Sequence, residues 1–536
     1  MLARPEGSGV TRALRQCTWA GLLLALGACG SSEPVVGLSG SVEGFAGAIV
    51  ADEPRAATIG RDVLSAGGSA ADAAVATYFA LAVTMPSTAG LGGGGVCLVH
   101  DQEAKTVEAL DFLPRPAPAG QVAVPANARG MAALHARYGI LPWAQLLGSA
   151  ETLARFGTPA SRALSRELAN VSEAVLRDPE MARVFANADG TPLIEGQNLI
   201  QPELAGTLSR LRRNGAGDLY IGAFARSFAE SAQSIGAPLT LEALQATVPN
   251  FRAAAELSYG NHILYAPPTP ATGGIASAQM IGLIDSEGSF DDDSEAVRAH
   301  LVAEASKQVF AMRESWASSP DAAAQLSDEQ IAAMEARFDS NRATPASSFG
   351  SSFGGTLDNP WSTGFVTADQ DGNMVACAVT MNALFGAKRM APGTGIILAP
   401  AGEAGGAGYR SLGPIILANP NNGMSYFAGA ASGGETGITA LANLFLRIAD
   451  AEQDLSAAML QPRVHHNATP DMLFHESGLD VSLQSALQQR GHALSQGAIL
   501  GRVNVIWCPD SLKNSPETCR AAADPRTFGL AIILDE

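Results

Sequence analysis

Two adjacent hydroxyl residues, Ser362 and Thr363, begin an extended stretch that is followed by a second one after an Asp-Gly-Asn turn, in DNPWSTGFVTADQDGNMVACAVTMN. This pattern predicts a β-hairpin whose first strand starts with the two hydroxyls. A hydroxyl residue that becomes the first residue of a chain has its own α-amino group beside it as a general base. Such a nucleophile needs a strand start behind an exposed, cleavable loop, and a Ser/Gly-rich segment precedes this hairpin. The alternative is that both residues are ordinary polar residues at a strand start.

Three other motifs could indicate a different chemistry, but the sequence argues against it in each case. The glycines at 90–95 lack the Gly-Lys-Ser/Thr ending of a phosphate loop and precede a strand, which favours a close backbone approach to a ligand or another strand. Ser352 is central in GSSFG, but the nucleophile-elbow motif requires a strand before it and a helix after it. Adjacent histidines such as His465 and His466 point to opposite faces of a strand, which favours packing or surface roles. The sequence therefore calls for no cofactor and no metal.

Helices and strands occur in blocks along the chain. A helix, a Gly67-Gly68 stop and a second helix capped at Ser69 come first, and the pattern from 125 to 255 is mostly helical. An amphipathic helix is expected over 294–316, and a long surface loop is expected before Trp361. Strands are expected at 364–368, 374–381, 394–398, 503–507 and 527–534. Blocks without strict alternation favour a layered mixed α/β architecture over a parallel doubly wound sheet.

The N-terminus has the composition of an export signal. Three arginines precede the apolar run WAGLLLALGA at 19–28, which is too short to span a bilayer. The run ends in LGAC, which is similar to a bacterial lipobox, so we expect a signal peptide over 1–28, a lipid on Cys29 and a flexible tether over 29–43. This places the protein on the periplasmic side of a bacterial cell envelope. The alternatives are a plain signal peptide cut nearby or a short anchor.

Charge and cysteine content narrow the choice of partners and of compartment. The chain has 34 Lys and Arg against 52 Asp and Glu, a net charge of -18, which disfavours nucleic acid or an anionic lipid surface as a partner. Cys97 and Cys377 lie in apolar strand-like runs and are predicted to be buried, inert thiols. Cys508 and Cys519 bracket a polar loop, and an oxidising compartment would favour a disulfide between them.

Several segments, in order, resemble the γ-glutamyltranspeptidase family of N-terminal nucleophile hydrolases. They are GRDVLSAGGSAADAAVATYFALAVTMPSTAGLGGGGVCLV, YAPPTPATGGI, HLVAEASKQVFAMR, QPRVHHN and ADPRT. The resemblance covers nearly the whole mature chain. It implies a four-layer αββα sandwich and self-cleavage into a large fragment, 44–361, and a small fragment, 362–536, that remain associated.

The resemblance also assigns catalytic roles to residues of this chain. Anchored on DQDGN, the family's nucleophile falls on Ser362 and the cut between Trp361 and Ser362, with Thr363 as the alternative nucleophile. Thr380 matches a threonine that hydrogen-bonds the nucleophile. Gly433 and Gly434 match the pair whose N–H groups form the oxyanion hole.

Substrate recognition departs from the family pattern. Asn382 matches an asparagine that contacts the glutamyl group, but Leu113 stands where the family has an arginine for the α-carboxylate. Arg115, two residues on, is the candidate replacement, and Glu403 is a candidate for an acidic contact. The family's histidine after the two hydroxyls is Gly364 here.

The predicted function is therefore hydrolysis of, or acyl transfer from, a small-molecule amide or peptide through an acyl-enzyme, with glutathione or another γ-glutamyl amide as the substrate that the family implies. A non-catalytic, non-processed binding lipoprotein of the same fold is the alternative.

Overall fold

Two β-sheets form the centre of the chain in the computed structural model, which describes residues 47–118, 120–291, 294–350, 362–402 and 408–534. The first sheet has seven strands, in the order β20 (Leu530–Leu534), β1 (Gly47–Ala51), β9 (Ser362–Asp369), β10 (Met374–Thr380), β2 (Gly94–Asp101), β3 (Thr106–Phe112) and β6 (Asn250–Ala253). The second has six, in the order β19 (Arg520–Ala523), β18 (Arg502–Trp507), β14 (Ser425–Ser432), β13 (Ile415–Ala418), β8 (His262–Ala266) and β7 (Ala255–Tyr259). Every pairing in both sheets is antiparallel.

Side-chain alternation along the strands explains the stacking of the sheets. Phe365 and Val375 face the helices that cover the first sheet, whereas their neighbours Val366 and Ala376 face the second sheet. Every described residue of β9 except Ser362 is buried. A strand buried on both faces must lie between two layers, so β9 and β10 are interior strands.

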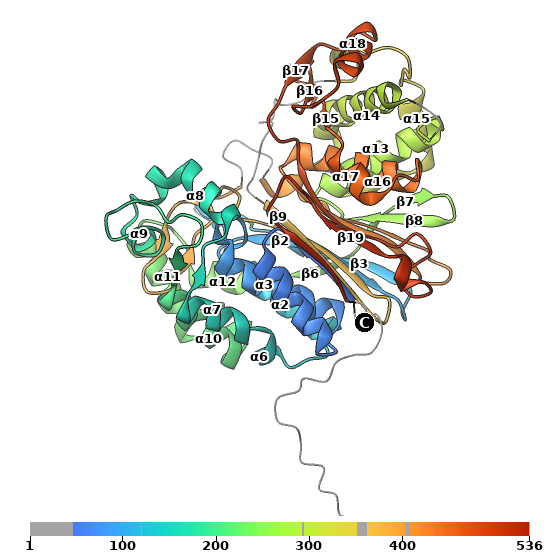
Figure 1. Cartoon of the computed structure of the whole chain (residues 1–536). Helices are drawn as coiled ribbons and strands as arrows, with labels where there is room; N and C mark the ends of the chain where they lie inside the picture. Colours follow the sequence, from blue (N-terminus) through green and yellow to red (C-terminus); the bar gives the residue numbers. More distant parts are fainter. Residues whose placement is uncertain (1–46, 119, 292–293, 351–361, 403–407, 535–536) are drawn as a thin grey trace, which may run out of the picture. The chain divides into compact units, whose positions relative to one another are not determined.

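Helices cover the outer face of each sheet (Figure 1). The first sheet is covered by α2 (Pro54–Ser65), α3 (Ala70–Thr84), the short α4 (Pro86–Ala89) and α5 (Asn127–Tyr138). The second is covered by α13 (Gly273–Glu287), α16 (Glu435–Ala449) and α17 (Leu455–Leu460). Further out, α14 (Glu295–Trp316) and α15 (Asp328–Glu335) pack on α13, and α18 (Val481–Gln489) packs on α14. The predicted αββα sandwich is confirmed.

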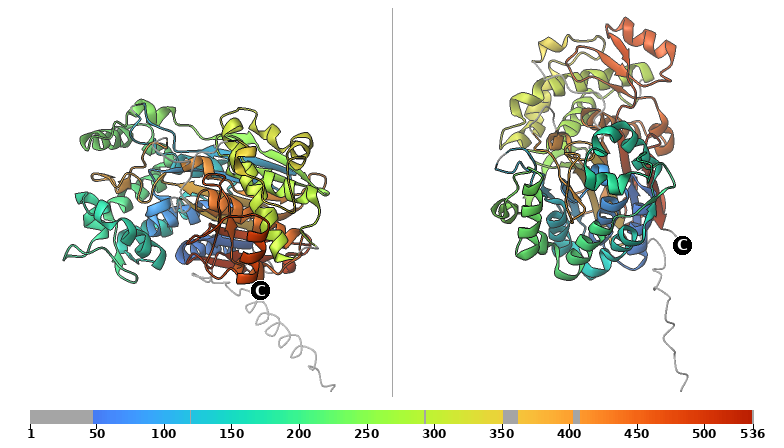
Figure 2. Two further views of the ribbon diagram at one scale, coloured as in Figure 1. Left: turned by 90° about the horizontal axis from the view of Figure 1, so that it is seen from above. Right: turned by 90° about the vertical axis from the view of Figure 1, so that its left-hand side faces the viewer.

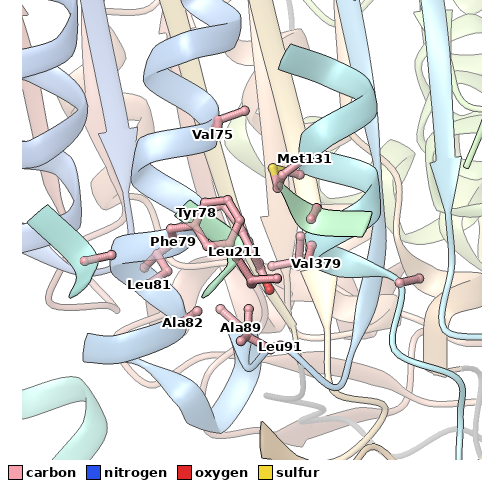
Figure 3. Packing of buried hydrophobic residues seen from close by; sticks show 14 of the residues in the cluster. Val75, Tyr78, Phe79, Leu81, Ala82, Ala89, Leu91, Met131, Leu211 and Val379 are labelled. Carbon is pink, nitrogen blue, oxygen red and sulfur yellow. The ribbon is translucent and has the colours of Figure 1, made fainter. Parts of the chain in front are cut away.

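The helix pair α2 and α3 fits its sequence closely. The Ser69 side chain accepts a hydrogen bond from the Asp72 N–H, and the Asp72 carboxylate accepts one from the Ser69 N–H, which is a capping box. All fifteen residues of α3 are buried. Tyr78 and Phe79 of α3 pack with Met131 of α5 and Val379 of β10 (Figure 3). This packing holds α3 against β10, which forms a hairpin with β9, the strand that begins with Ser362 and Thr363.

The segment between β3 and β6 is helical, as predicted, and gathers on one side of the sandwich (Figure 2). After α5, its helices are α6 (Trp143–Leu146), α7 (Gly148–Phe156), α8 (Arg162–Val175), α9 (Pro179–Phe185), α10 (Pro202–Asn214), α11 (Ala223–Ser234) and α12 (Leu241–Ala246). Short pairings complete the structure: β4 (Thr158–Pro159) with β5 (Asn198–Leu199), β11 (Met390–Ala391) with β12 (Ile396–Ile397), and β15 (Val464–His465), β16 (Leu473–His475) and β17 (Leu494–Gln496).

Two expectations about local structure were wrong. The helix predicted over 294–316 has nearly the expected bounds, but it is not amphipathic, because every residue from Ala299 to Ala311 is buried. Its charged residues Glu304 and Lys307 pair with each other inside the layer. The segment predicted as a long surface loop contains α15, whose N-terminus is capped by Ser327.

Candidate active site

Ser362 begins β9 and lines a cavity of about 320 Å³. The cavity also receives Asp52 from the end of β1, Ser432 from the end of β14 and Arg502 from the start of β18. Ends of strands from both sheets therefore meet at Ser362. The rest of its wall comes from α8 and three connecting segments; its members are Met85, Ala163, Arg166, Glu167, Ala169, Asn170, Ile499, Arg526, Thr527 and Phe528.

The predicted hairpin places Thr380 beside the nucleophile candidate. β9 and β10 pair in a register that puts Thr380 directly opposite Ser362, and Gly94 of β2 lies on the other side of Thr380. Directly opposed residues of antiparallel strands present their side chains on the same face. The Thr380 hydroxyl oxygen accepts a hydrogen bond from the Asn382 N–H at 2.9 Å. The two residues are therefore neighbours across the strand pair, and the hydrogen bond from Thr380 to the Ser362 hydroxyl stays a prediction.

Thr363 has a different environment from Ser362. It is fully buried and does not line the cavity. Its hydroxyl donates to Asp52 Oδ2 at 2.6 Å. Asp52 Oδ1 accepts from Asn504 Nδ2 at 2.8 Å, and the same amide donates to the Gly364 carbonyl at 2.8 Å. Burial raises the pKa of Asp52, although the hydrogen bonds that its carboxylate accepts from Thr363 and Asn504, and the nearby charge of Arg502, lower it. This geometry favours Ser362 over Thr363 as the reacting hydroxyl.

The glycine pair lies between β14 and α16. Gly433 and Gly434 have φ of 107° and 67°, which side chains rarely adopt. Gly434 is the N-cap of α16, so the N–H groups in this turn lie at the positive end of a helix dipole. Ser432, the preceding residue, lines the cavity with Ser362. The turn is therefore placed to donate hydrogen bonds to a developing oxyanion.

The two sheets approach each other closely beside Ser362. A Cβ added to Gly364 would lie 2.8 Å from the Cβ of Ala430 in β14. The glycine-rich turn makes a similar approach, because a Cβ on Gly93 would lie 2.1 Å from the Thr380 carbonyl oxygen. The prediction that these glycines allow close backbone contact is confirmed. Glycine at 364, where the family has histidine, suits this spacing.

Of the predicted glutamate-binding residues, neither Arg115 nor Asn382 lines the cavity with Ser362. Arg115 pairs with Asp111 at 2.7 Å and lines a different cavity, of about 490 Å³. Asn382 donates from Nδ2 to the Pro400 carbonyl at 3.1 Å, while its buried Oδ1 has no hydrogen-bond partner among the described residues. Glu403 lies outside the described residues.

Leu113 lies where the family has its arginine, and it is completely buried. It packs in a small apolar cluster whose other members are Val96, Ala271, Ala378 and Leu412. A carboxylate would lose its hydration against this cluster without gaining a cation. The position therefore has no means of binding the α-carboxylate of a glutamyl group.

Several cavity residues could not be found from the sequence. Arg166 of α8 stacks on Phe528 with 5.4 Å between its guanidinium and the ring centroid, and Arg162, one turn earlier, stacks at 5.5 Å. Arg526 is fixed by Glu476, at 2.5 and 2.6 Å. The i, i+4 spacing of two arginines on a helix was the only signal, and it did not reveal which side chain they would contact.

Cysteine pairing was predicted in part. The Cys508–Cys519 disulfide is confirmed. Cys97 and Cys377 are buried as expected, but the prediction that they are inert thiols was wrong, because they form a second disulfide. They are direct cross-strand partners of β2 and β10. Because their sequence separation is 280, only the sheet register brings them together.

A buried cluster on α14 resembles a metal site in composition. His300, Glu304 and His492 place ligand atoms within 4.8 Å of one another. However, Lys307 forms an ion pair with Glu304, and the His300 and His492 rings are joined by a 2.8 Å hydrogen bond. A resident ammonium group already supplies the positive charge there, so we assign the cluster a role in packing.

Comparison with known proteins agrees with this geometry. The family model described as Gamma-glutamyltranspeptidase matches residues 56–120, 115–405 and 403–534. The chain belongs to the γ-glutamyltranspeptidase family. It is 26% identical to the glutathione hydrolase proenzyme of Escherichia coli (strain K12) over 537 residues, 90% of each chain. It is 29% identical to the glutathione hydrolase 5 proenzyme of Mus musculus over 500 residues, 84% of this chain and 86% of the relative.

Solved structures show the same fold. The cephalosporin acylase from Bacillus halodurans aligns with a TM-score of 0.78 at 22% identity, covering 94% of this chain and 99% of that one. The γ-glutamyltranspeptidase of Helicobacter pylori aligns with a TM-score of 0.52 at 25% identity, covering 58% of this chain and 96% of that one. Within the part of this γ-glutamyltranspeptidase-family chain that the structure describes, no helix is long and apolar enough to cross a membrane.

Proposed function

We propose that this chain cleaves itself between Trp361 and Ser362, and that the freed Ser362 then transfers acyl groups from amides. One observation carries the proposal: Ser362 is the first residue of β9, lines the cavity and lies opposite Thr380. The alternative nucleophile, Thr363, is buried and bound to Asp52. No contact among the described residues favours a binding protein that is never processed.

Self-cleavage would begin with the Ser362 hydroxyl. Its oxygen attacks the Trp361 carbonyl carbon, and the peptide C–N bond breaks as the nitrogen of Ser362 takes a proton. The product is an ester between Trp361 and the Ser362 oxygen. Water hydrolyses this ester, which leaves a carboxylate on Trp361 and a free α-amino group on Ser362.

The free α-amino group would then act as the general base in turnover. It takes the proton of the Ser362 hydroxyl as the oxygen attacks the substrate carbonyl carbon, and it returns the proton to the departing amine. The N–H groups of the Gly433–Gly434 turn stabilise the oxyanion. Water, or an amine acceptor, releases the acyl group from the Ser362 ester and restores the hydroxyl.

The acyl group is the part of the substrate on which this chain differs from its family. γ-Glutamyl amides are the substrates implied by relatives named glutathione hydrolase. Leu113 removes the expected carboxylate contact, whereas two arginines, Arg166 and Arg502, line the cavity with Ser362. We therefore propose that the acyl group of the substrate carries a carboxylate that these arginines attract. The enzyme does not require the amino group that lies next to this carboxylate in a γ-glutamyl substrate.

We also infer that the protein is exported and anchored by a lipid on Cys29, which lies outside the described residues. Two disulfides among the described residues support an oxidising compartment.

A reducing denaturing gel tests the proposal. Wild-type protein expressed without residues 1–28 should give two fragments, and Ser362→Ala should give one intact band. Fragments that persist in Ser362→Ala but disappear in Thr363→Ala would move the nucleophile by one residue. An intact wild-type band would refute self-cleavage and favour the binding protein.

Substrate preference is tested on the processed enzyme with three matched anilides, whose acyl groups are γ-glutamyl, glutaryl and butyryl. Glutaryl retains the carboxylate without the amino group, and butyryl lacks both. We expect the highest kcat/KM for glutaryl. A kcat/KM for the γ-glutamyl anilide tenfold or more above that for the glutaryl anilide would contradict the proposal that the substrate's amino group is not recognised.

A further inference from the structure

The start of β9 extends beyond the strand that pairs with one of its edges. β1 pairs with β9 from Gly47 opposite Asp369 to Ala51 opposite Phe365. On its other edge, β9 pairs with β10 as far as Ser362 opposite Thr380. Residues 362–364 therefore have a strand neighbour on the β10 side and none on the β1 side within the described residues.

Two side chains hold this overhanging end where β1 stops. Asp52, the first residue after β1, accepts the Thr363 hydroxyl, and Asn504 of β18 donates to both Asp52 and the Gly364 carbonyl. All three side chains are buried, with Asp52 and Asn504 each 2% exposed. The contacts join the first sheet to the second one residue away from Ser362. We call Asp52, Thr363 and Asn504 the bracket.

Cleavage would make this end a chain terminus. The first residues of a chain fray unless they are tied down, and a strand held on one edge has fewer hydrogen bonds to lose. A nucleophile needs its reacting atoms within a narrow range of positions. The demand for fixation is thus greatest after cleavage, when the preceding peptide bond no longer restrains Ser362.

We propose that Asp52 and Asn504 are positioning residues that, through Thr363 and Gly364, hold the freed Ser362 in its reactive position. The inference rests on the proposed function, because the bracket can position a nucleophile only if Ser362 is that nucleophile. Neither residue exchanges a proton or forms a bond in the reaction. Their effect is to replace the missing β1 ladder with two side chains.

Two substitutions of Thr363 distinguish the effect of its hydroxyl from the effect of its side-chain shape. Thr363→Val keeps the shape of the side chain and removes the hydroxyl, whereas Thr363→Ser keeps the hydroxyl. We expect kcat of Thr363→Val to fall by about tenfold to hundredfold with little change in KM, because a displacement near 1 Å has about that effect. Thr363→Ser should recover most of the loss.

Thr367→Val is the matched control for lost hydrogen bonding. Thr367 is also fully buried on β9, and its hydroxyl donates to the Ala70 carbonyl at 2.7 Å. It lies inside the stretch that β1 covers. Both valine variants should lose similar thermal stability, but only Thr363→Val should lose kcat.

Asn504→Ala provides a second route if Thr363→Val does not fold. It removes the amide that donates to Asp52 and Gly364, and it should lower kcat in the same direction. The inference is overturned if both variants process and turn over like wild type, or if Thr367→Val lowers kcat as much as Thr363→Val does. A wild type that stays intact overturns the proposed function instead, and so does complete loss of cleavage in Thr363→Val with retention in Ser362→Ala.

Discussion

Replacing Gly364 by alanine should impair catalysis more than folding, because it acts on the contact between the two sheets beside the nucleophile. The added Cβ would lie 2.8 Å from the Cβ of Ala430 and 3.1 Å from its carbonyl carbon. Carbon atoms in favourable contact are about 3.5–4.0 Å apart, so β9 and β14 must separate by roughly 0.7–1.2 Å. Gly364 has no positive φ, and the effect is therefore steric rather than conformational.

The separation moves Ser362, two residues before Gly364, away from the Gly433 turn, three residues after Ala430. A displacement of about 1 Å typically lowers the rate by about a hundredfold, so we expect kcat to fall by about tenfold to hundredfold. Overpacking a well-packed interior costs about 1–3 kcal/mol, which lowers the unfolding temperature without preventing folding.

Steady-state kinetics of the processed enzyme, with thermal unfolding followed by circular dichroism, measure both effects. Gly206→Ala on α10 is the control, because no atom lies within 4 Å of the added Cβ. It should leave kcat unchanged. Ala430→Gly, added to Gly364→Ala, removes the nearest contact and should restore part of kcat. Wild-type kcat in Gly364→Ala, or no recovery in the double variant, would refute the reasoning.

Three further predictions concern other parts of the chain. Burial lowers the pKa of His300 to about 4 and that of His492 to about 3, so the stability they contribute is present above pH 6.5 and is lost as the pH falls; an unfolding temperature constant from pH 7 to pH 4 would contradict this. Cys29→Ala should release the protein from the membrane fraction, and release that is already complete in wild type would exclude the lipid anchor. Arg166→Ala should lower kcat/KM at least tenfold for the glutaryl anilide and less than threefold for the butyryl anilide; equal losses would exclude a charge contact.

The sequence predicted the parts of the site that depend on local order. The Asp-Gly-Asn turn sets the register of its hairpin, and this register brings Thr380 opposite Ser362. The capped helix pair was equally predictable, since Ser69 and the two glycines before it determine where one helix stops and the next begins.

The rest depends on contacts between distant segments. Asp52 lies next to Thr363 because β1 ends one residue before it, and no local pattern records where a neighbouring strand stops. Phe528 and Arg166 belong to distant segments of the chain and meet only at the cavity wall. The helix over 294–316 was expected to be amphipathic, but its Lys307 is buried and Glu304 compensates the charge inside the fold.

The Cys97–Cys377 disulfide also affects the outcome of the proposed cleavage between Trp361 and Ser362. Cys97 precedes the cut and Cys377 follows it, so cleavage would leave two polypeptides still linked by a covalent bond across adjacent strands. The nucleophile-bearing fragment then cannot dissociate on dilution, because its partner is held at a high effective concentration. A non-reducing gel would show the mature enzyme as a single species. Maturation would thus be visible only after the sulfur–sulfur bond has been reduced.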